Sequence, residues 1–252
     1  MRASESRGRQ TEWFTGWFES EHYLKLYSHR DDADAHKLVA LLQNNLKLPK
    51  NARVLDLACG AARHALIFAG KGYKVTGYDL SSTLLEIGKN AAVSKNVKLD
   101  LVRGDIRAFP FHKGYDLVLN IFTSWGYFSN DEQNAEVLRS AISLKKENGY
   151  FVLDTMNPRF VQKNLKPFEN IVKNGVEYRI SKEIADNRVI KRITFNDSGE
   201  EYHFLESVRL YNRKDIESFI VNSGVKKLLW FGDYSGGDFR EESSPRIICI
   251  AS

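Results

Sequence analysis

The sequence has few cysteines and no long apolar run. Cys59 and Cys249 are the two cysteines among 252 residues, too few for a disulfide framework, and no group of Cys and His has metal-ligand spacing. No apolar run approaches the roughly 18 residues that a membrane-spanning helix needs. These absences argue against a disulfide-stabilised secreted protein and a membrane protein. We expect a cytoplasmic protein without a bound metal.

The beginning of the chain also lacks an apolar segment. The stretch MRASESRGRQ has charged residues with nothing apolar behind them, so it does not resemble a secretory signal. Its Arg and Ser content is a weak indication of a transit peptide, and a disordered tail over residues 1–12 is the favoured interpretation. The net charge of +5 permits an anionic partner. Because the basic residues are scattered and not interleaved with aromatics, we do not expect a nucleic-acid partner.

Apolar runs alternate with helix-like segments through the middle of the chain. Strands that are apolar throughout and that alternate with helices are typical of a parallel sheet covered on both faces. The pattern predicts a single α/β domain with a doubly wound sheet. Strands are expected at residues 53–57, 74–78, 97–102, 115–121 and 150–154, with helices at 62–70, 82–92 and 132–144.

The segments on either side of this core have different patterns. Residues 13–27 are rich in aromatics at helical spacing and 31–46 continue helically, which predicts N-terminal lid helices over 13–48. Residues 158–212 predict an antiparallel β insertion over the active site, with hairpin turns at Asn174-Gly175, Asp186-Asn187 and Ser198-Gly199. A helix at 214–222 and strands at 225–231 and 246–251 complete the fold. The exposed strand edges of the insertion suggest a homodimer.

The ends of the first two predicted strands carry a glycine and acidic residues. The stretch from Arg53 to Arg63 reads RVLDLACGAAR, in which Gly60 permits a sharp turn and the close approach of a ligand. Asp79 ends the next strand, where a carboxylate can accept hydrogen bonds from both hydroxyls of a ribose. Since ligands of open α/β sheets bind beyond the carboxyl ends of the strands, the pattern predicts a ligand that contains a nucleoside.

A nicotinamide dinucleotide offers such a ribose, and so does a cofactor with a single adenosine. The sequence of the loop after the first strand distinguishes between these two cofactors. The dinucleotide fingerprint needs glycines where this chain has Ala58, Gly60 and Arg63, so one of three is kept. Asp56 ends the first strand, where it favours a cationic ligand end. A ligand with an adenosine, an amino-acid end and a positive sulfonium therefore fits better than a nicotinamide dinucleotide.

The motifs VLDLACG, GYDLS and GDIR, followed by an apolar run that ends at Asn120, resemble the successive motifs of class I S-adenosylmethionine-dependent methyltransferases. The resemblance covers roughly residues 54–154, and the flanking segments are similar to a bacterial and archaeal small-molecule subgroup. It implies a Rossmann-like seven-stranded sheet, mostly parallel with the last strand antiparallel, and S-adenosyl-L-methionine as cofactor. The family loop usually carries more glycine than this chain, which has Ala58 and Ala62.

The resemblance also implies roles for residues at the strand ends. Asp79 would hold the ribose, and Asp105 would receive the adenine amino group. The full set of expected cofactor-binding residues is Tyr23, Arg30, Asp56, Ala58, Cys59, Gly60, Arg63, Asp79, Leu80, Asp105, Ile106, Asn120 and Phe122. In the alternative interpretation Asp79 and Asp105 only cap the following helix or turn, Cys59 is a small filler and Arg63 is a surface residue.

Methyl transfer leaves a faint catalytic pattern, because the sulfonium already activates the methyl group and the protein mainly aligns the acceptor. We expect His203 or Tyr27 as the catalytic group, with His203 the candidate general base. The expected acceptor-side residues are Ser124, Tyr127, Asp154 and Asn157.

The leading hypothesis is methyl transfer to a small-molecule nitrogen or oxygen acceptor. An RNA or protein methyltransferase, a module that binds the cofactor without turnover and a nicotinamide-dependent oxidoreductase remain alternatives.

Overall fold

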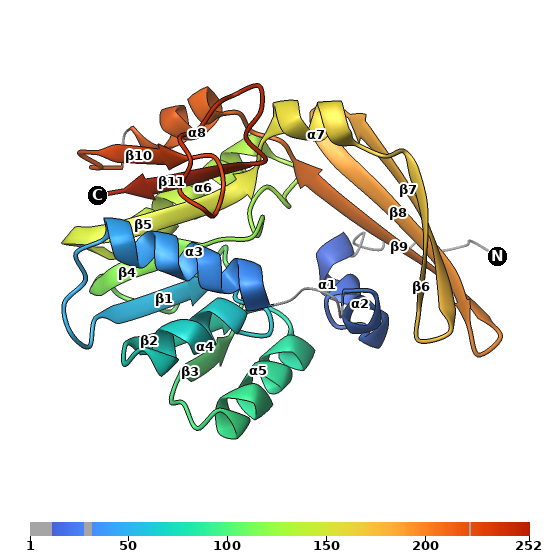
Figure 1. The fold of residues 1–252 in the computed structure, drawn as a ribbon, viewed down its shortest axis with the longest axis horizontal. Coiled ribbons are helices and arrows are strands. Elements are labelled where there is room, and N and C mark those ends of the chain that lie inside the picture. Colours follow the sequence, from blue (N-terminus) through green and yellow to red (C-terminus); the bar gives the residue numbers. More distant parts are fainter. Residues whose placement is uncertain (1–11, 28–31, 222) are drawn as a thin grey trace, which may run out of the picture.

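The computed structural model describes residues 12–27, 32–221 and 223–252. These residues form a seven-stranded sheet and a separate four-stranded sheet, which face each other across the molecule (Figure 1). The predicted N-terminal tail falls outside the described residues apart from Glu12, and so does Arg30.

The seven-stranded sheet has the order β10-β11-β5-β4-β1-β2-β3. Strands β1 to β5 pair in parallel, whereas β11 is antiparallel to both of its neighbours, β5 and β10. This arrangement confirms the predicted fold class. The strands are β1 (Arg53–Leu57), β2 (Lys74–Asp79), β3 (Asp100–Arg103), β4 (Tyr115–Asn120), β5 (Lys145–Met156), β10 (Leu228–Phe231) and β11 (Arg246–Ala251).

Helices cover both faces of this sheet, because alternate strand residues are apolar on both sides. Val54 packs in the cluster with α3 and α4, while Leu55 and Leu57 pack in the cluster with α6 and α8. None of the helices in the described part of the chain is both long and apolar enough to cross a lipid bilayer. The helices are α3 (Asp32–Asn45), α4 (Arg63–Gly70), α5 (Ser82–Ser94), α6 (Asp131–Ser143), α7 (Pro158–Asn164) and α8 (Arg213–Ile220).

The four-stranded sheet is an antiparallel meander inserted between β5 and α8. Its three hairpins turn at the predicted dipeptides, and all six turn residues have positive φ, as two-residue type I′ turns require. The strands are β6 (Phe168–Lys173), β7 (Val176–Ala185), β8 (Arg188–Asp197) and β9 (Glu200–Arg209).

Two short helices, α1 (Trp13–Trp17) and α2 (Glu21–Leu26), lie between the sheets (Figure 1). Trp17 and Leu26 are fully buried against the inner face of the four-stranded sheet, in a cluster with Ile180 and Phe195. The aromatic residues of this segment therefore fill the space between the sheets and bring the N-terminal helices to the carboxyl ends of the parallel strands.

Candidate functional site

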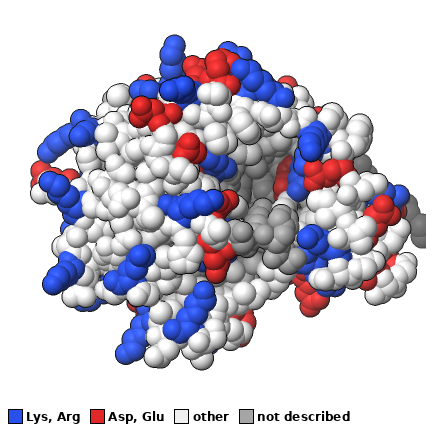
Figure 2. All heavy atoms as spheres, viewed as in Figure 1, with Lys and Arg blue, Asp and Glu red and all other residues white. Residues whose placement is uncertain are grey.

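A cavity of about 800 Å³ opens at the carboxyl ends of β1, β2 and β4. Its walls are the strand-end loops, the helices α1 and α2, and the inner face of β7, β8 and β9. Figure 2 shows the face of the molecule hollowed between the two sheets. The predicted residues among its lining are Tyr23, Tyr27, Asp56, Ala58, Cys59, Gly60, Arg63, Asp79, Leu80, Asp105, Ile106, Phe122, Ser124 and Tyr127.

The loop after β1 has the left-handed backbone that glycine adopts most easily. Ala58, Gly60 and Ala62 have φ of 54°, 55° and 60°, and each such non-glycine residue costs about 1–2 kcal/mol. A Cβ placed on Gly60 would meet only Leu84 Cδ1, at 3.8 Å, so the protein leaves room beside this backbone. The two alanines thus hold a backbone conformation that glycine adopts most easily.

Asp79 connects the first two strand ends. Its carboxylate is 8% exposed and accepts hydrogen bonds from the backbone amides of Gly60 (2.7 Å) and Ser81 (2.8 Å). Burial raises the pKa of Asp79. The side chain that caps α5 is that of Ser81, which accepts from the Leu84 amide, so Asp79 is not the helix cap. Each oxygen of a carboxylate has a second lone pair, and the Asp79 carboxylate lines the cavity.

Asp56 lies deeper in the same wall and is 1% exposed. Burial first, and then the charge of Asp79, raise the pKa of Asp56 to about 7, although an amide hydrogen bond from Ala65 and the charge of Arg63 act in the opposite direction. Among the described residues its buried Oδ2 has no hydrogen-bond partner. A buried oxygen without a partner costs about 1–3 kcal/mol, and a ligand that donates a hydrogen bond there would recover this cost.

His64 and Cys59 complete this wall. His64, which was not among the predicted site residues, is 6% exposed and lines the cavity. Burial lowers its pKa to about 3, so its imidazole is neutral. The sequence signal that could have identified His64 was its position directly after the loop that contains Gly60. Burial raises the pKa of the Cys59 thiol, which therefore stays protonated and is not a nucleophile.

Asp105 holds the turn after β3. It accepts hydrogen bonds from the backbone amide (2.8 Å) and Nε (3.0 Å) of Arg107, and Arg107 also forms an ion pair with Glu12 at 2.8 Å. Burial would raise the pKa of Asp105, but the hydrogen bonds from Arg107 outweigh it and lower that pKa. Asp105 therefore holds this turn, and it also lines the cavity beside Leu80 and Ile106.

Asn120, Asp154 and Asn157 do not line the cavity. Asn120 is 3% exposed and donates to the carbonyl of Leu57 at 3.4 Å. Asp154 is fully buried and instead fixes the loop after β4, since it accepts from the Phe122 amide at 2.9 Å and from the side chains of Tyr234 and Arg246.

Asn157 caps α7, accepting from the Arg159 amide at 3.2 Å and donating to the Ser244 carbonyl at 2.7 Å. Asp154 and Asn157 were both expected to contact the acceptor, and both are occupied in holding segments that are distant in sequence.

His203 lies on the outer face of the four-stranded sheet. Its side chain is 65% exposed, and its nearest charged partner is Glu201 at 3.4 Å. Alternate residues of a strand face opposite sides, and Glu206 and Val208 of the same strand line the cavity. The odd-numbered His203 therefore points away, and we assign it no role as a base.

The wall opposite the strand ends is polar where α2 meets the sheet. Glu206 Oε1 accepts hydrogen bonds from the Tyr27 hydroxyl and from Trp17 Nε1, both at 2.7 Å. Lys191 contacts the Tyr27 hydroxyl, and its ammonium lies 3.7 Å from Glu206 Oε2. Lys182 also lines this wall. Neither lysine nor Glu206 was predicted.

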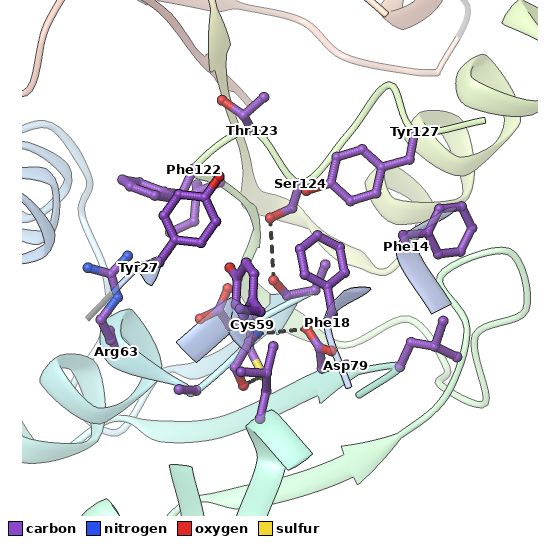
Figure 3. A pocket seen from close by; sticks show the side chains of 18 of the residues that line it. Phe14, Phe18, Tyr27, Cys59, Arg63, Asp79, Phe122, Thr123, Ser124 and Tyr127 are labelled. Atoms are coloured by element: carbon purple, nitrogen blue, oxygen red, sulfur yellow. Dashed lines mark hydrogen bonds between the residues drawn. The ribbon is translucent and has the colours of Figure 1, made fainter. Parts of the chain in front are cut away.

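The loop after β4 forms the roof between the two walls. Ser124 donates to the carbonyl of Ala58 at 3.4 Å. In Figure 3 the aromatic side chains of Phe18, Tyr27 and Phe122 gather above Cys59 and Asp79. The cavity thus has an acidic end at the strand termini, an aromatic middle and a basic wall on the inserted sheet.

Residues 54–149 match the family model described as a methyltransferase domain. Residues 54–149 therefore form a methyltransferase domain. The matched segment begins in β1 and ends in β5. The methyltransferase domain therefore contains Asp56, Gly60, Asp79 and Asp105, and the inserted sheet lies outside the match.

Named methyltransferases are similar to part of this chain. The chain is 31% identical over 108 residues to the putative methyltransferase YqeM of Bacillus subtilis, covering 42% of this chain and 43% of the relative. It is 31% identical over 105 residues to the dTDP-3-amino-3,6-dideoxy-alpha-D-glucopyranose N,N-dimethyltransferase of Streptomyces fradiae, covering 42% of this chain and 38% of that enzyme. The matches thus span less than half the length of these relatives.

A solved structure is similar over nearly the whole chain. The S-adenosylmethionine-dependent methyltransferase from Clostridium acetobutylicum has a TM-score of 0.76 at 21% identity, covering 92% of this chain and 96% of that one. At this identity the likeness concerns the fold. It extends beyond the methyltransferase domain, since the coverage includes regions outside residues 54–149.

Proposed function

We propose that the protein is a methyltransferase that transfers the methyl group of S-adenosylmethionine to a nitrogen or oxygen atom of a small molecule. The observation that carries the proposal is the cavity at the strand ends of the methyltransferase domain, which holds Asp56, Gly60 and Asp79 on one wall. The opposite wall, on the inserted sheet, supplies space and polar groups for a second molecule. A cavity shared by two ligands suits a group transfer between them.

The residues of the acidic end fit this cofactor. The partnerless Oδ2 of Asp56 is suited to the ammonium of the methionine part, and the remaining lone pairs of Asp79 are suited to the ribose hydroxyls. Leu80 and Ile106 offer apolar surface for an adenine ring, and Asp105 lies beside them. We expect Arg63 and Tyr23 to contact the amino-acid end. The cofactor, when bound, supplies a methyl group already activated by its sulfonium.

The chain itself aligns the acceptor and keeps water away. We propose that α1 and α2 act as a lid, because Phe14, Phe18, Tyr23 and Tyr27 close the side of the cavity that the sheets leave open. We assign Ser124 and Tyr127, in the roof, to contact with the acceptor. Tyr27 is our candidate for the group that receives or orients the acceptor proton, since its hydroxyl already donates to Glu206.

The relative from Streptomyces fradiae suggests which acceptors to test first. Its name specifies dimethylation of the amino group of a nucleotide-linked sugar. Since that similarity covers 42% of this chain, it supports a nitrogen acceptor without fixing the acceptor. A panel would contain nucleotide-linked amino sugars, simple primary amines and catechols, with transfer of a labelled methyl group as the readout.

The cofactor assignment is tested by replacing Asp79. We expect Asp79→Ala to weaken the binding of S-adenosylhomocysteine about 100-fold, because each hydrogen bond to a charged group contributes roughly 1.5–3 kcal/mol. Isothermal titration calorimetry measures the affinity, and thermal unfolding checks that the variant is folded. The exposed Asp100, at the start of β3, gives the matched control Asp100→Ala. Equal affinity in a folded Asp79→Ala variant would refute the assignment.

A further inference from the structure

The inner face of the four-stranded sheet carries a charged row among apolar ones. The hairpin register places Lys182 opposite Lys191, and Lys191 opposite Glu206. The neighbouring rows are Ile180, Ile193 and Phe204 on one side and Ile184, Val189 and Val208 on the other. Lys182, Lys191 and Glu206 line the cavity, so the charged row meets the space beside the strand-end loops.

This row places two like charges side by side in a half-buried position. Like charges directly opposite each other on a sheet are destabilising, and the side chains of Lys182 and Lys191 are only 23% and 15% exposed. Glu206 offsets Lys191 from within the cavity, whereas Glu169, which pairs with Lys182 at 2.6 Å, lies on β6 and does not reach the cavity wall. The cavity therefore presents two ammonium groups and one carboxylate on this wall.

We propose that Lys182 and Lys191 bind a phosphate group of the methyl acceptor, an inference that rests on the methyltransferase function proposed above. An ammonium binds phosphate as a compact point charge with three donors, so two neighbouring ammonium groups can share the oxygens of one phosphate. The two arginines that line the cavity lie on the side of the large sheet: Arg63 begins α4, and Arg246 of β11 is engaged with Asp154 and Thr123.

The charges at the two ends of the cavity give the acceptor a direction. Asp56, Asp79 and Asp105 line the strand-end side of the cavity together with Arg63, while the lysine row on the inserted sheet attracts an anion. The apolar rows beside the lysines suit the less polar parts of the acceptor. The phosphate would therefore lie against the inserted sheet, with the methylated atom toward the strand-end loops.

The proposal is tested with inorganic pyrophosphate as probe. Protein saturated with S-adenosylhomocysteine is titrated with pyrophosphate at low ionic strength by calorimetry. We expect Lys182→Met and Lys191→Met each to weaken pyrophosphate binding at least about tenfold. Because Lys191 also contacts Tyr27, Lys191→Arg serves as a second variant and should restore most of the binding. The affinity for S-adenosylhomocysteine should not change in these variants.

Arg192→Met is the matched control. Arg192 follows Lys191 on β8, pairs with Glu183 and is 55% exposed on the opposite face, so its loss removes the same charge without touching the cavity. We expect unchanged pyrophosphate binding. Unchanged binding in both lysine variants, or no binding to the parent protein, would overturn the phosphate site.

Two further titrations distinguish a phosphate from a carboxylate ligand and the anion site from the cofactor site. Malonate is titrated in the same way, and tighter binding of this dicarboxylate than of pyrophosphate would contradict a phosphate group in favour of a carboxylate. Pyrophosphate is also titrated into the ligand-free protein. If S-adenosylhomocysteine fails to bind while the lysine variants still lose pyrophosphate, the cofactor assignment fails and the anion site stands.

Discussion

Asp56 is the residue whose ionisation bears most directly on ligand binding. Its pKa of about 7 means that the side chain is largely protonated below neutral pH. A ligand ammonium beside its partnerless Oδ2 would favour the ionised form, so binding would release a proton at low pH. The raised pKa itself reflects the cost of keeping a buried carboxylate close to Asp79.

We predict that the affinity for S-adenosylhomocysteine rises with pH through about 7. The sign follows from linkage: binding is tighter where Asp56 is already ionised, and affinity falls by up to about tenfold per pH unit below its pKa. Calorimetry in buffers of different ionisation enthalpy should detect proton release near pH ~6 and little near pH ~8.

Asp56→Asn removes the titrating group and should flatten this dependence. A parent protein whose affinity does not change across this range would rule out the role of Asp56.

The acidic residues also show what the sequence could not reveal. Asp79 and Asp154 each follow an apolar strand, and both were expected at the site. The structure separates them through their partners, because Asp154 pairs with the side chain of Arg246, 92 residues later, whereas Asp79 accepts from the backbone amides of Gly60 and Ser81. The positions of carboxylates at predicted strand ends show which of them reach the edge of the sheet. They do not show which carboxylate forms an ion pair with an arginine far along the chain.

At the scale of elements, the short helices α1 and α2 are fastened to the large sheet through Glu19. Its carboxylate accepts from the amides of Ser82 (2.8 Å) and Thr83 (3.1 Å) and from the Thr83 hydroxyl (2.7 Å). It thus satisfies the first amides of α5 from outside that helix. Burial would raise the pKa of Glu19, but these hydrogen bonds outweigh it and lower the pKa to about 2.

We predict that Glu19→Ala destabilises the protein by about 1 kcal/mol, the usual effect of losing a helix cap. Because the folded-state pKa is lowered, this stability is present above the ordinary pKa of 4.5 and is lost as pH falls toward about 2. Denaturant unfolding of parent and variant should differ at neutral pH and converge in acid. The control is Glu86→Ala, which replaces an exposed glutamate of α5. An equal loss of stability in this control, or a difference between parent and Glu19→Ala that persists in acid, would contradict the proposed role of Glu19 in capping α5.

Several elements could be predicted because their signals are local. The type I′ turns of the insertion need residues that accept positive φ, and Asn-Gly, Asp-Asn and Ser-Gly supply them. The same turns fix the register, so the row of Lys182, Lys191 and Glu206 was readable from the sequence, as was the outward direction of His203. The helix α7 was missed although Asn157 and Pro158 are a typical helix start.

At the scale of the whole molecule, the N-terminal helices connect the two sheets around the cavity. Trp17 and Tyr27 donate to Glu206 on the inserted sheet, while Glu12 and Glu19 bind residues next to the large sheet. The aromatic composition of residues 13–27 predicted burial but not against which surface. Contacts between such distant segments depend on the tertiary arrangement, which no local pattern contains.

The central claim is that the cavity at the strand ends of the methyltransferase domain binds S-adenosylmethionine. The most direct measurement is a crystal structure with S-adenosylhomocysteine bound. We predict the ribose hydroxyls within hydrogen-bonding distance of Asp79, the ammonium beside Asp56, and the ring between Leu80 and Ile106. A bound ligand that lies elsewhere and leaves Asp56, Gly60 and Asp79 without contact would contradict the account.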